Sequence, residues 1–275
     1  MSDQPKVAII TPFYKRDLSP EETISLRHLN HFLGPYDKYL VMPEGKKGGL
    51  KGFQKTFVPQ KYFKSLDSYS HLLLSKKFYQ RFARYDYILI YQLDSLVFSD
   101  QLMEWCVRGY DYIGAPWLKE FGFPWTQGKD LVGNGGFSLR KVDKFIEILE
   151  NYNHIEFLTK RLLSSARRLT LRLPKRIYKA IVRSEAKTTL YDLYHNPYRL
   201  LNWLNRGYSG EDLFWSVEAS QYVRQYIKAP VEQALAFSFE ANPASCFKKN
   251  HNTLPFGCHA WPKNNRNFWE AYLLQ

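Results

Sequence analysis

Apolar and polar residues alternate along the amino-terminal half of the chain in short blocks of strand and helix type. β-rich runs predict strands at residues 7–12, 38–43, 87–94 and 110–115. Helical spacing of apolar residues predicts helices at residues 20–33, 68–83, 100–107 and 142–150. Because strands and helices alternate, we expect an α/β fold with a central, mostly parallel mixed sheet flanked by helices, of the Rossmann-like kind.

The alternation stops after residue 150, where a basic, amphipathic segment continues until about residue 205. The lysines and arginines between residues 160 and 187 are opposed only by Glu185 and are interleaved with leucine and isoleucine. This pattern fits a solvated helical face, a helix on an anionic membrane surface, or a cover over a polyanionic acceptor. We expect one domain over residues 1–275 with a basic helical insertion at about 155–205.

Charge and hydropathy narrow the class of protein. The net charge of +13 attracts anions without distinguishing nucleic acid, anionic lipid and phosphorylated sugars. Because the cations concentrate in one segment, a membrane surface or an anionic glycan is favoured over nucleic acid. No apolar run approaches the roughly 18 residues of a membrane span, and the first residues lack a secretory-signal pattern. We therefore expect a cytoplasmic protein, peripheral at the inner face of the membrane if the basic segment binds lipid.

Four chemically notable features follow one another along the chain. They are Gln92-Leu93-Asp94, Gly133-Asn134-Gly135-Gly136, Glu211-Asp212, and His259 within Gly257-Cys258-His259-Ala260-Trp261. Ligands gather at the carboxyl ends of strands in open α/β sheets, so Asp94 lies where chemistry is usual. Each feature alone is a weak signal.

In this order, behind a strand-loop-helix unit of nucleotide-binding type, the four features resemble the common core of the GT-A glycosyltransferases. The resemblance covers nearly the whole chain apart from the basic segment. It implies the GT-A fold and a divalent cation, Mn²⁺ or Mg²⁺, that neutralises the diphosphate leaving group of a nucleotide sugar. The Asp-x-Asp motif of that fold is Gln92-x-Asp94 here. We therefore expect Asp94 and His259 as metal ligands, with Gln92 binding a ribose or sugar hydroxyl and metal affinity lowered by the missing charge.

The resemblance also assigns the remaining site residues. Asp212 is expected to deprotonate the acceptor hydroxyl as it attacks the anomeric carbon, which gives inversion in one displacement. The residues expected at the acceptor or the transferred sugar are Glu211, Gly135, Asn134 and Trp215. Those expected at the nucleotide sugar are Thr11, Pro12, Tyr14, Arg16 and Gly133, together with Gln92.

Each of these residues also has a purely structural interpretation. Asp94 fits a strand end satisfied by turn amides, and the glycines fit a tight turn. Glu211 and Asp212 fit a helix amino terminus, where acidic side chains are favoured. A lone histidine or tryptophan is commonly a packed residue.

The expected function is a metal-dependent, inverting glycosyltransferase, with a uridine-linked donor and a saccharide or lipid-linked saccharide acceptor in cell-surface polysaccharide or lipopolysaccharide synthesis. Two alternatives stay open: a retaining GT-A transferase, and a non-catalytic basic module for membrane or glycan binding. An aspartate-nucleophile phosphatase is disfavoured, because Leu96 stands where a second aspartate is needed.

Overall fold

The computed structural model describes residues 4–152 and 210–274 of the chain. The predicted basic insertion at about 155–205, with the cationic residues 160–187, lies outside the described residues. Across the two described ranges, no helix combines the length and the apolar character needed to cross a bilayer.

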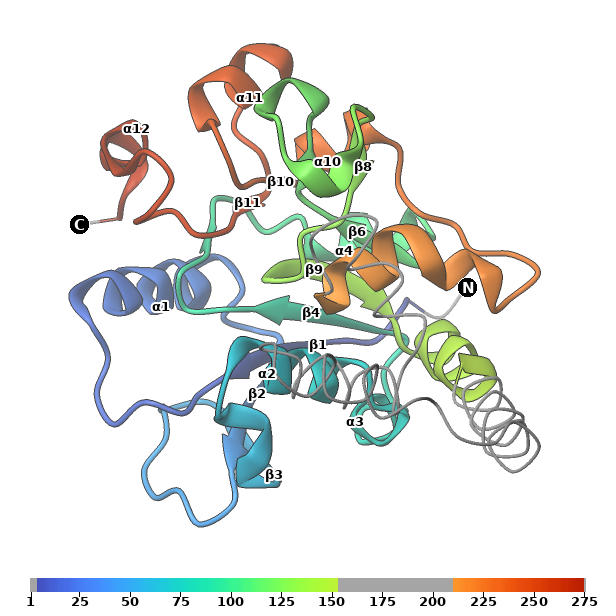
Figure 1. The fold of residues 1–275 in the computed structure, drawn as a ribbon. Coiled ribbons are helices and arrows are strands. Elements are labelled where there is room, and N and C mark those ends of the chain that lie inside the picture. Colours follow the sequence, from blue (N-terminus) through green and yellow to red (C-terminus); the bar gives the residue numbers. More distant parts are fainter. Residues whose placement is uncertain (1–3, 153–209, 275) are drawn as a thin grey trace, which may run out of the picture.

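A six-stranded mixed sheet forms the centre of the described structure, in the order β3-β2-β1-β4-β9-β6 (Figure 1). Its strands are β1 (Val7–Pro12), β2 (Asp37–Pro43), β3 (Gln54–Val58), β4 (Tyr87–Tyr91), β6 (Tyr112–Gly114) and β9 (Phe137–Lys141). β1 pairs in parallel with β2 and β4, and β2 with β3, whereas β9 runs antiparallel to β4 and β6. The expected α/β fold with a mostly parallel mixed sheet is confirmed.

Helices cover both faces of the sheet. Successive residues of the central strands point to opposite faces, and the residues on both faces are buried. Ile10 and Ile90 join one apolar core, together with residues of α2 (Leu66–Leu73), α3 (Lys76–Gln80), the helix over residues 142–152, and the turn that follows α9 (Glu211–Leu213). Ile9 and Leu89 join a second core with α1 (Pro20–Phe32), α4 (Leu102–Val107) and α10 (Val231–Phe237).

Among the differences from the predicted elements, two concern the segments α2, α3 and β3. The helix predicted over residues 68–83 is two helices, α2 and α3, and the Tyr79 hydroxyl donates to the Leu73 carbonyl at 2.9 Å where α2 ends. Strand β3 was not predicted, because it is an edge strand whose first four residues, Gln54 to Phe57, are mostly exposed and only Val58 is buried.

A smaller three-stranded sheet, in the order β10-β11-β5, lies beside the central one. It consists of β10 (Ser238–Phe239), β11 (Gly257–Cys258) and β5 (Leu96–Val97), and it packs against α11 (Pro243–Lys249) and α12 (Arg266–Trp269) through a third apolar core. A two-stranded ribbon of β7 (Pro116–Trp117) and β8 (Leu131–Val132) precedes the glycine-rich loop. Short 3-10 turns lie at Gln60–Phe63, Lys119–Phe121, Pro124–Thr126, Ala219–Gln221 and Glu270–Tyr272, and a π turn at Phe214–Glu218.

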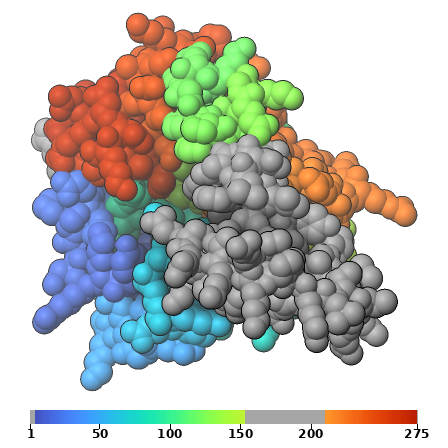
Figure 2. Space-filling model, viewed as in Figure 1, coloured from blue at the N-terminus to red at the C-terminus, as the bar shows by residue number. Residues whose placement is uncertain are grey.

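The carboxy-terminal residues lie on α1. In Figure 2 the red carboxy-terminal segment lies against the blue amino-terminal residues. Arg27 Nη1 donates to the Leu274 carbonyl at 2.8 Å, and the Leu274 amide donates to His28 Nε2 at 2.9 Å. Arg266 also pairs with Glu21 at 2.8 Å. These contacts fix the small sheet, which carries His259, relative to the central one.

Candidate functional site

Asp94 lies in the short crossing between the two sheets, three residues after β4 ends. The chain leaves β4 at Tyr91 and enters β5 at Leu96, which pairs antiparallel with Cys258 of β11. The Asp94 carbonyl accepts from the Trp261 amide at 3.1 Å, and the His259 amide donates to the Phe239 carbonyl at 2.9 Å. The pairing of β5 with β11 therefore places His259 beside Asp94, although 165 residues separate them in the chain.

The imidazole of His259 contacts both polar residues of the motif that follows β4. Its Nε2 lies 3.3 Å from Asp94 Oδ1 and 3.2 Å from Gln92 Oε1. The side chains of His259 and Asp94 are 13% and 30% exposed, so the pair is sheltered yet reachable from solvent. Burial alone raises the pKa of Asp94, but the hydrogen bond and charge of His259, with the charge of Lys263, outweigh it, and the net pKa is lowered.

A residue that the sequence interpretation missed lies on the other side of the same imidazole. Glu240 follows β10 directly, and its Oε1 lies 3.2 Å from His259 Nδ1. Burial lowers the pKa of His259, but its hydrogen bonds to Asp94 and Glu240 raise it more, to about 10. A carboxylate that closes the largely apolar run of residues 234–239 was the available sequence signal, of the same kind as the one that pointed to Asp94.

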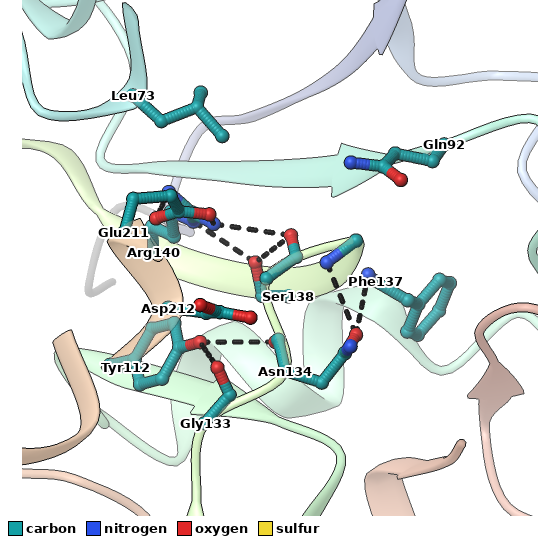
Figure 3. A network of polar contacts seen from close by, with 12 residues as sticks. Leu73, Gln92, Tyr112, Gly133, Asn134, Phe137, Ser138, Arg140, Glu211 and Asp212 are labelled. Atoms are coloured by element: carbon teal, nitrogen blue, oxygen red, sulfur yellow. Dashed lines mark hydrogen bonds and ion pairs between the residues drawn. The ribbon is translucent and has the colours of Figure 1, made fainter. Parts of the chain in front are cut away.

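The glycine-rich loop between β8 and β9 is held by Asn134. The Asn134 Oδ1 accepts from the Gly136 amide at 3.1 Å, and its Nδ2 donates to Glu240 Oε1 at 2.6 Å (Figure 3 shows the loop side of this network). The Gly136 carbonyl accepts from the Gln92 amide at 3.0 Å. Asn134 is 4% exposed, so the structure gives it a role in shaping the loop, beside the predicted contact with a sugar.

The glycines of this loop allow other side chains of the site to approach the main chain closely. A β-carbon on Gly136 would lie 2.1 Å from His259 Nε2, and one on Gly135 would lie 2.3 Å from Glu211 Oε1. A β-carbon on Gly133 would lie 2.3 Å from the ring of Trp117. Real β-carbons do not approach heavy atoms this closely, so the loop needs glycine at all three positions. The loop thereby joins the Asp94 and His259 side of the site to the Glu211 and Asp212 side.

Glu211 forms a buried, bidentate ion pair with Arg140 of β9. Arg140 Nη1 and Nη2 donate to the two Glu211 oxygens at 3.1 and 2.9 Å. Arg140 also donates to Ser138 Oγ at 2.9 Å, to the Tyr79 hydroxyl at 2.9 Å and to the Gly135 carbonyl at 3.1 Å. Burial lowers the pKa of Arg140, but the Glu211 carboxylate more than compensates and the net pKa is raised. Glu211 therefore anchors α9 to the loop, and its predicted contact with an acceptor stays a prediction.

Asp212 is half-buried and lies next to this anchored pair. Its β-carbon would be 3.3 Å from a β-carbon on Gly135, and its Oδ1 accepts from the Leu213 amide at 2.9 Å. In Figure 3 the Asp212 carboxylate lies between the Arg140 side chain and Asn134 and points toward the glycine-rich loop. The anchored Glu211 thus fixes the backbone from which Asp212 projects.

A cleft of about 590 Å³ opens on the other side of Asp94, at the carboxyl end of β1. Its polar lining includes Gln92, Asp94 and three lysines, and its apolar lining includes three aromatic rings. The residues used below are Lys15, Lys64, Lys263, Tyr14, Phe63 and Tyr69. Tyr14 is 55% exposed and its ring lies 5.7 Å from that of Phe63. A space of ligand size thus carries cationic and aromatic groups, together with the carboxylates of Glu21, Glu22 and Asp94.

Only some of the residues predicted at the nucleotide sugar line the cleft. Pro12, Tyr14 and Gln92 line the cleft. Thr11 is fully buried in β1, and the exposed Arg16 is not part of the lining, whereas its neighbour Lys15 is. Gly133 packs on Trp117, not on the cleft.

Trp215, predicted at the acceptor, is fully buried. Its ring stacks on Phe145 at 3.9 Å and lies edge-on to Tyr79 at 6.0 Å. The structure therefore gives Trp215 a packing role under α9 in place of the predicted sugar contact.

The arrangement of donor atoms around His259 Nε2 fits a divalent cation. Ligand atoms at neighbouring positions of an octahedral ion, with bonds of about 2.1 Å, lie about 3 Å apart. Asp94 Oδ1 and Gln92 Oε1 lie close to that spacing from Nε2. Within residues 4–152 and 210–274, no three His, Cys, Asp or Glu side chains gather into a metal-binding group. A cation bound by Asp94 and His259 would therefore need further oxygens, which a substrate diphosphate carries.

Comparison with solved structures found chains that resemble this one at low identity. The galactosyltransferase LgtC in complex with donor and acceptor sugar analogs is 11% identical, with a TM-score of 0.46, over 92% of this chain and 86% of that chain. An active-site mutant of LgtC is 13% identical, with a TM-score of 0.47, over the same shares. A glycosyltransferase involved in glycosylation of the major capsid of PBCV-1 is 10% identical, with a TM-score of 0.44, over 98% of each chain. At these scores the likenesses do not assign an activity.

No curated protein matches the chain. A family model does, over residues 52–259, a range that contains the site from Gln92 and Asp94 through the glycine-rich loop to His259. This range covers more than half of the sequence. The chain belongs to the family described as protein of unknown function (DUF5672).

Proposed function

We propose that this chain is a metal-dependent, inverting glycosyltransferase that moves a sugar from a nucleotide-diphosphate donor, preferentially uridine-linked, to a saccharide acceptor. The observation that carries the proposal is the meeting of Asp94 and His259, 3.3 Å apart, at the rim of the cleft, with the glycine-rich loop joining them to Asp212. Four features scattered from residue 92 to residue 259 thus form one site.

The cleft supports a nucleoside diphosphate as the bound part of the donor. Lys15, Lys64 and Lys263 supply positive charge for phosphate oxygens, and Tyr14 and Phe63 supply flat apolar faces for a base. Glu21 and Glu22 also line the cleft, and Lys15 pairs with Glu22 at 2.8 Å. The base would lie toward the end of β1, and the diphosphate toward Asp94.

Asp94 and His259 would hold the Mn²⁺ or Mg²⁺, with Gln92 as a neutral neighbour. When bound, the cation supplies charge neutralisation to the diphosphate as it leaves the sugar. Lys263, whose charge already acts on Asp94, adds a second positive group on the same side.

Asp212 would accept the proton of the acceptor hydroxyl. Its carboxylate lies at the glycine-rich loop, on a backbone fixed by Arg140 and Glu211. A base opposite the leaving group directs attack from the other face of the sugar and inverts the anomeric centre. A retaining transferase would not need this base, so the Asp212→Asn variant separates the two mechanisms.

The acceptor is proposed to be a lipid-linked or cell-surface saccharide, with the basic residues 160–187 meeting an anionic membrane at its inner face. A non-catalytic membrane- or glycan-binding module is the second candidate. It would not need the Asp94 and His259 pair, so a variant at Asp94 distinguishes it.

Calorimetric titration of uridine-diphosphate sugars with and without Mn²⁺ tests the proposal. We expect binding that strengthens with Mn²⁺ and that Asp94→Ala abolishes, followed by sugar release or transfer when saccharide acceptors are added. The matched control is Glu104→Ala, which removes an exposed carboxylate of α4. Equal binding by wild type and Asp94→Ala would refute the proposal.

A further inference from the structure

We infer that Glu240 is a positioning residue that fixes the tautomer and direction of His259, so that Nε2 faces Asp94 and is available to a divalent cation. The inference rests on the proposed function, because it takes His259 as a ligand of that cation. Glu240 would act through His259 and would not itself touch the cation.

The Glu240 carboxylate contacts three side-chain nitrogens from three different elements. Its Oε1 accepts from Asn134 Nδ2 at 2.6 Å and lies 3.2 Å from His259 Nδ1, and its Oε2 accepts from Trp117 Nε1 at 3.0 Å. The side chain is 18% exposed. A carboxylate with these three partners has little freedom to turn away from the imidazole.

When a cation takes the Nε2 lone pair, the position of this carboxylate gives the remaining ring hydrogen, on Nδ1, its acceptor. With hydrogen on Nδ1, the ring donates to Glu240 and leaves the Nε2 lone pair facing Asp94 and Gln92. Without a cation, Nε2 faces Asp94 Oδ1 at 3.3 Å just as Nδ1 faces Glu240 Oε1 at 3.2 Å, so a neutral ring opposes a lone pair to a carboxylate in either tautomer. A cation on the Nε2 side removes that repulsion there, and the hydrogen then belongs on Nδ1. A carboxylate on the second nitrogen is the usual partner of a metal-binding histidine, because it fixes the ring and makes the first nitrogen more basic.

The surrounding backbone supports the same geometry. β10 and β11 are parallel neighbours, and Glu240 and His259 follow them directly, so the two side chains leave adjacent strand ends. Gly136 packs against the imidazole, and Gly133 packs against the ring of Trp117. The two glycines thus limit movement of both His259 and the indole that donates to Glu240.

The test is a double-mutant cycle on Mn²⁺ affinity, measured by calorimetry or electron paramagnetic resonance on the full chain, with Mn²⁺ alone and with uridine diphosphate. We expect Glu240→Gln to weaken Mn²⁺ binding by about 10- to 100-fold. In the His259→Ala background, the same change should alter affinity less than about threefold, because the group through which Glu240 acts is gone. Glu232→Gln, an exposed glutamate of α10, is the matched control and should leave affinity unchanged.

Two outcomes would overturn the inference alone. In one, the wild type binds Mn²⁺ and Glu240→Gln changes the Mn²⁺ affinity by less than threefold. The other is an equal loss from Glu240→Gln in the presence and absence of His259. Failure of the wild type to bind Mn²⁺ with or without uridine diphosphate would instead refute the cation of the proposed function, and the inference with it.

A measurement on the wild type guards against a variant that fails to fold. With Mg²⁺ and uridine diphosphate bound, nitrogen–proton correlation spectra of His259 should show hydrogen on Nδ1 and none on Nε2. The opposite tautomer would overturn the inference without any mutation.

Discussion

The imidazole of His259 rests on the main chain of Gly136, so closely that a β-carbon there would lie 2.1 Å from Nε2. The same glycine has its carbonyl bonded to the Gln92 amide at 3.0 Å. One residue without a side chain therefore touches the two motifs that carry the proposed cation ligands, and its size sets their spacing.

Gly136→Ala should push the His259 ring away from Asp94. We expect at least a tenfold loss of Mn²⁺ affinity and a loss of about 1–3 kcal/mol in the free energy of unfolding, because the site has no room for a methyl group. Gly109→Ala is the control. No atom lies within 4 Å of its added carbon, and its cost is backbone strain at φ 76°. Unchanged metal binding in Gly136→Ala would contradict the close approach.

Asp212→Asn should lower the rate of sugar transfer by about 10²- to 10⁴-fold while donor and Mn²⁺ binding persist, because the amide cannot accept the acceptor proton. Steady-state kinetics with a donor and acceptor pair, with calorimetry of donor binding, measure the two effects separately. Asp100→Asn, at an exposed position after β5, should retain full activity. A fully active Asp212→Asn enzyme would remove Asp212 from the role of base.

Glu211→Gln should destabilise the protein by about 3 kcal/mol, because it leaves the buried guanidinium of Arg140 without its charge partner. Urea unfolding gives the free energy. Glu147→Gln, in the exposed Lys144 pair at 2.6 Å, should cost under about 1 kcal/mol. Equal costs for the two variants would mean that the Arg140 pair does not anchor α9.

Lys64→Ala and Lys263→Ala should each weaken uridine-diphosphate binding by about tenfold, because a charged donor to phosphate is lost. Both effects should shrink as salt is raised, since exposed charges are screened. Lys119→Ala, an exposed lysine on the ribbon that carries β7 and β8, should have no effect on binding. If neither substitution weakens uridine-diphosphate binding, the diphosphate binds elsewhere.

His28 should make the free energy of unfolding depend on pH. Burial lowers its pKa below the ordinary 6.5, against the raising effect of its bond to the Val97 carbonyl, and its Nε2 accepts from the Leu274 amide. The unfolded chain then binds the proton first, so the free energy of unfolding should fall as pH drops from about 6.5 toward the lowered folded pKa. Thermal melts from pH 7.5 to 5 measure this slope. His28→Gln should flatten it, and an unchanged slope would refute the assignment.

The central sheet was predictable because its strands carry a local signal. β1 and β4 are short and apolar, and Asp94, three residues after β4, stands out because it closes such a run. β3 lacked such a signal, since an edge strand needs no apolar pattern.

The chemistry of single side chains was harder to predict, because it depends on neighbours distant in sequence. Glu211 and Asp212 are adjacent, yet one is tied to Arg140 of β9 and the other points toward the loop. Glu240 was overlooked because its importance arises only when β10 pairs with β11. Trp215 was predicted to meet a sugar, whereas Phe145 and Tyr79 enclose it.

The pairing of β5 with β11 has a consequence for synthesis of the chain. A nascent polypeptide can assemble most of the central sheet once β9 has emerged, but Asp94 lacks its imidazole neighbour until residues near 259 leave the ribosome. Ion capture would therefore be deferred until that segment has emerged, which gives a growing chain little chance to trap a cation in a half-made pocket.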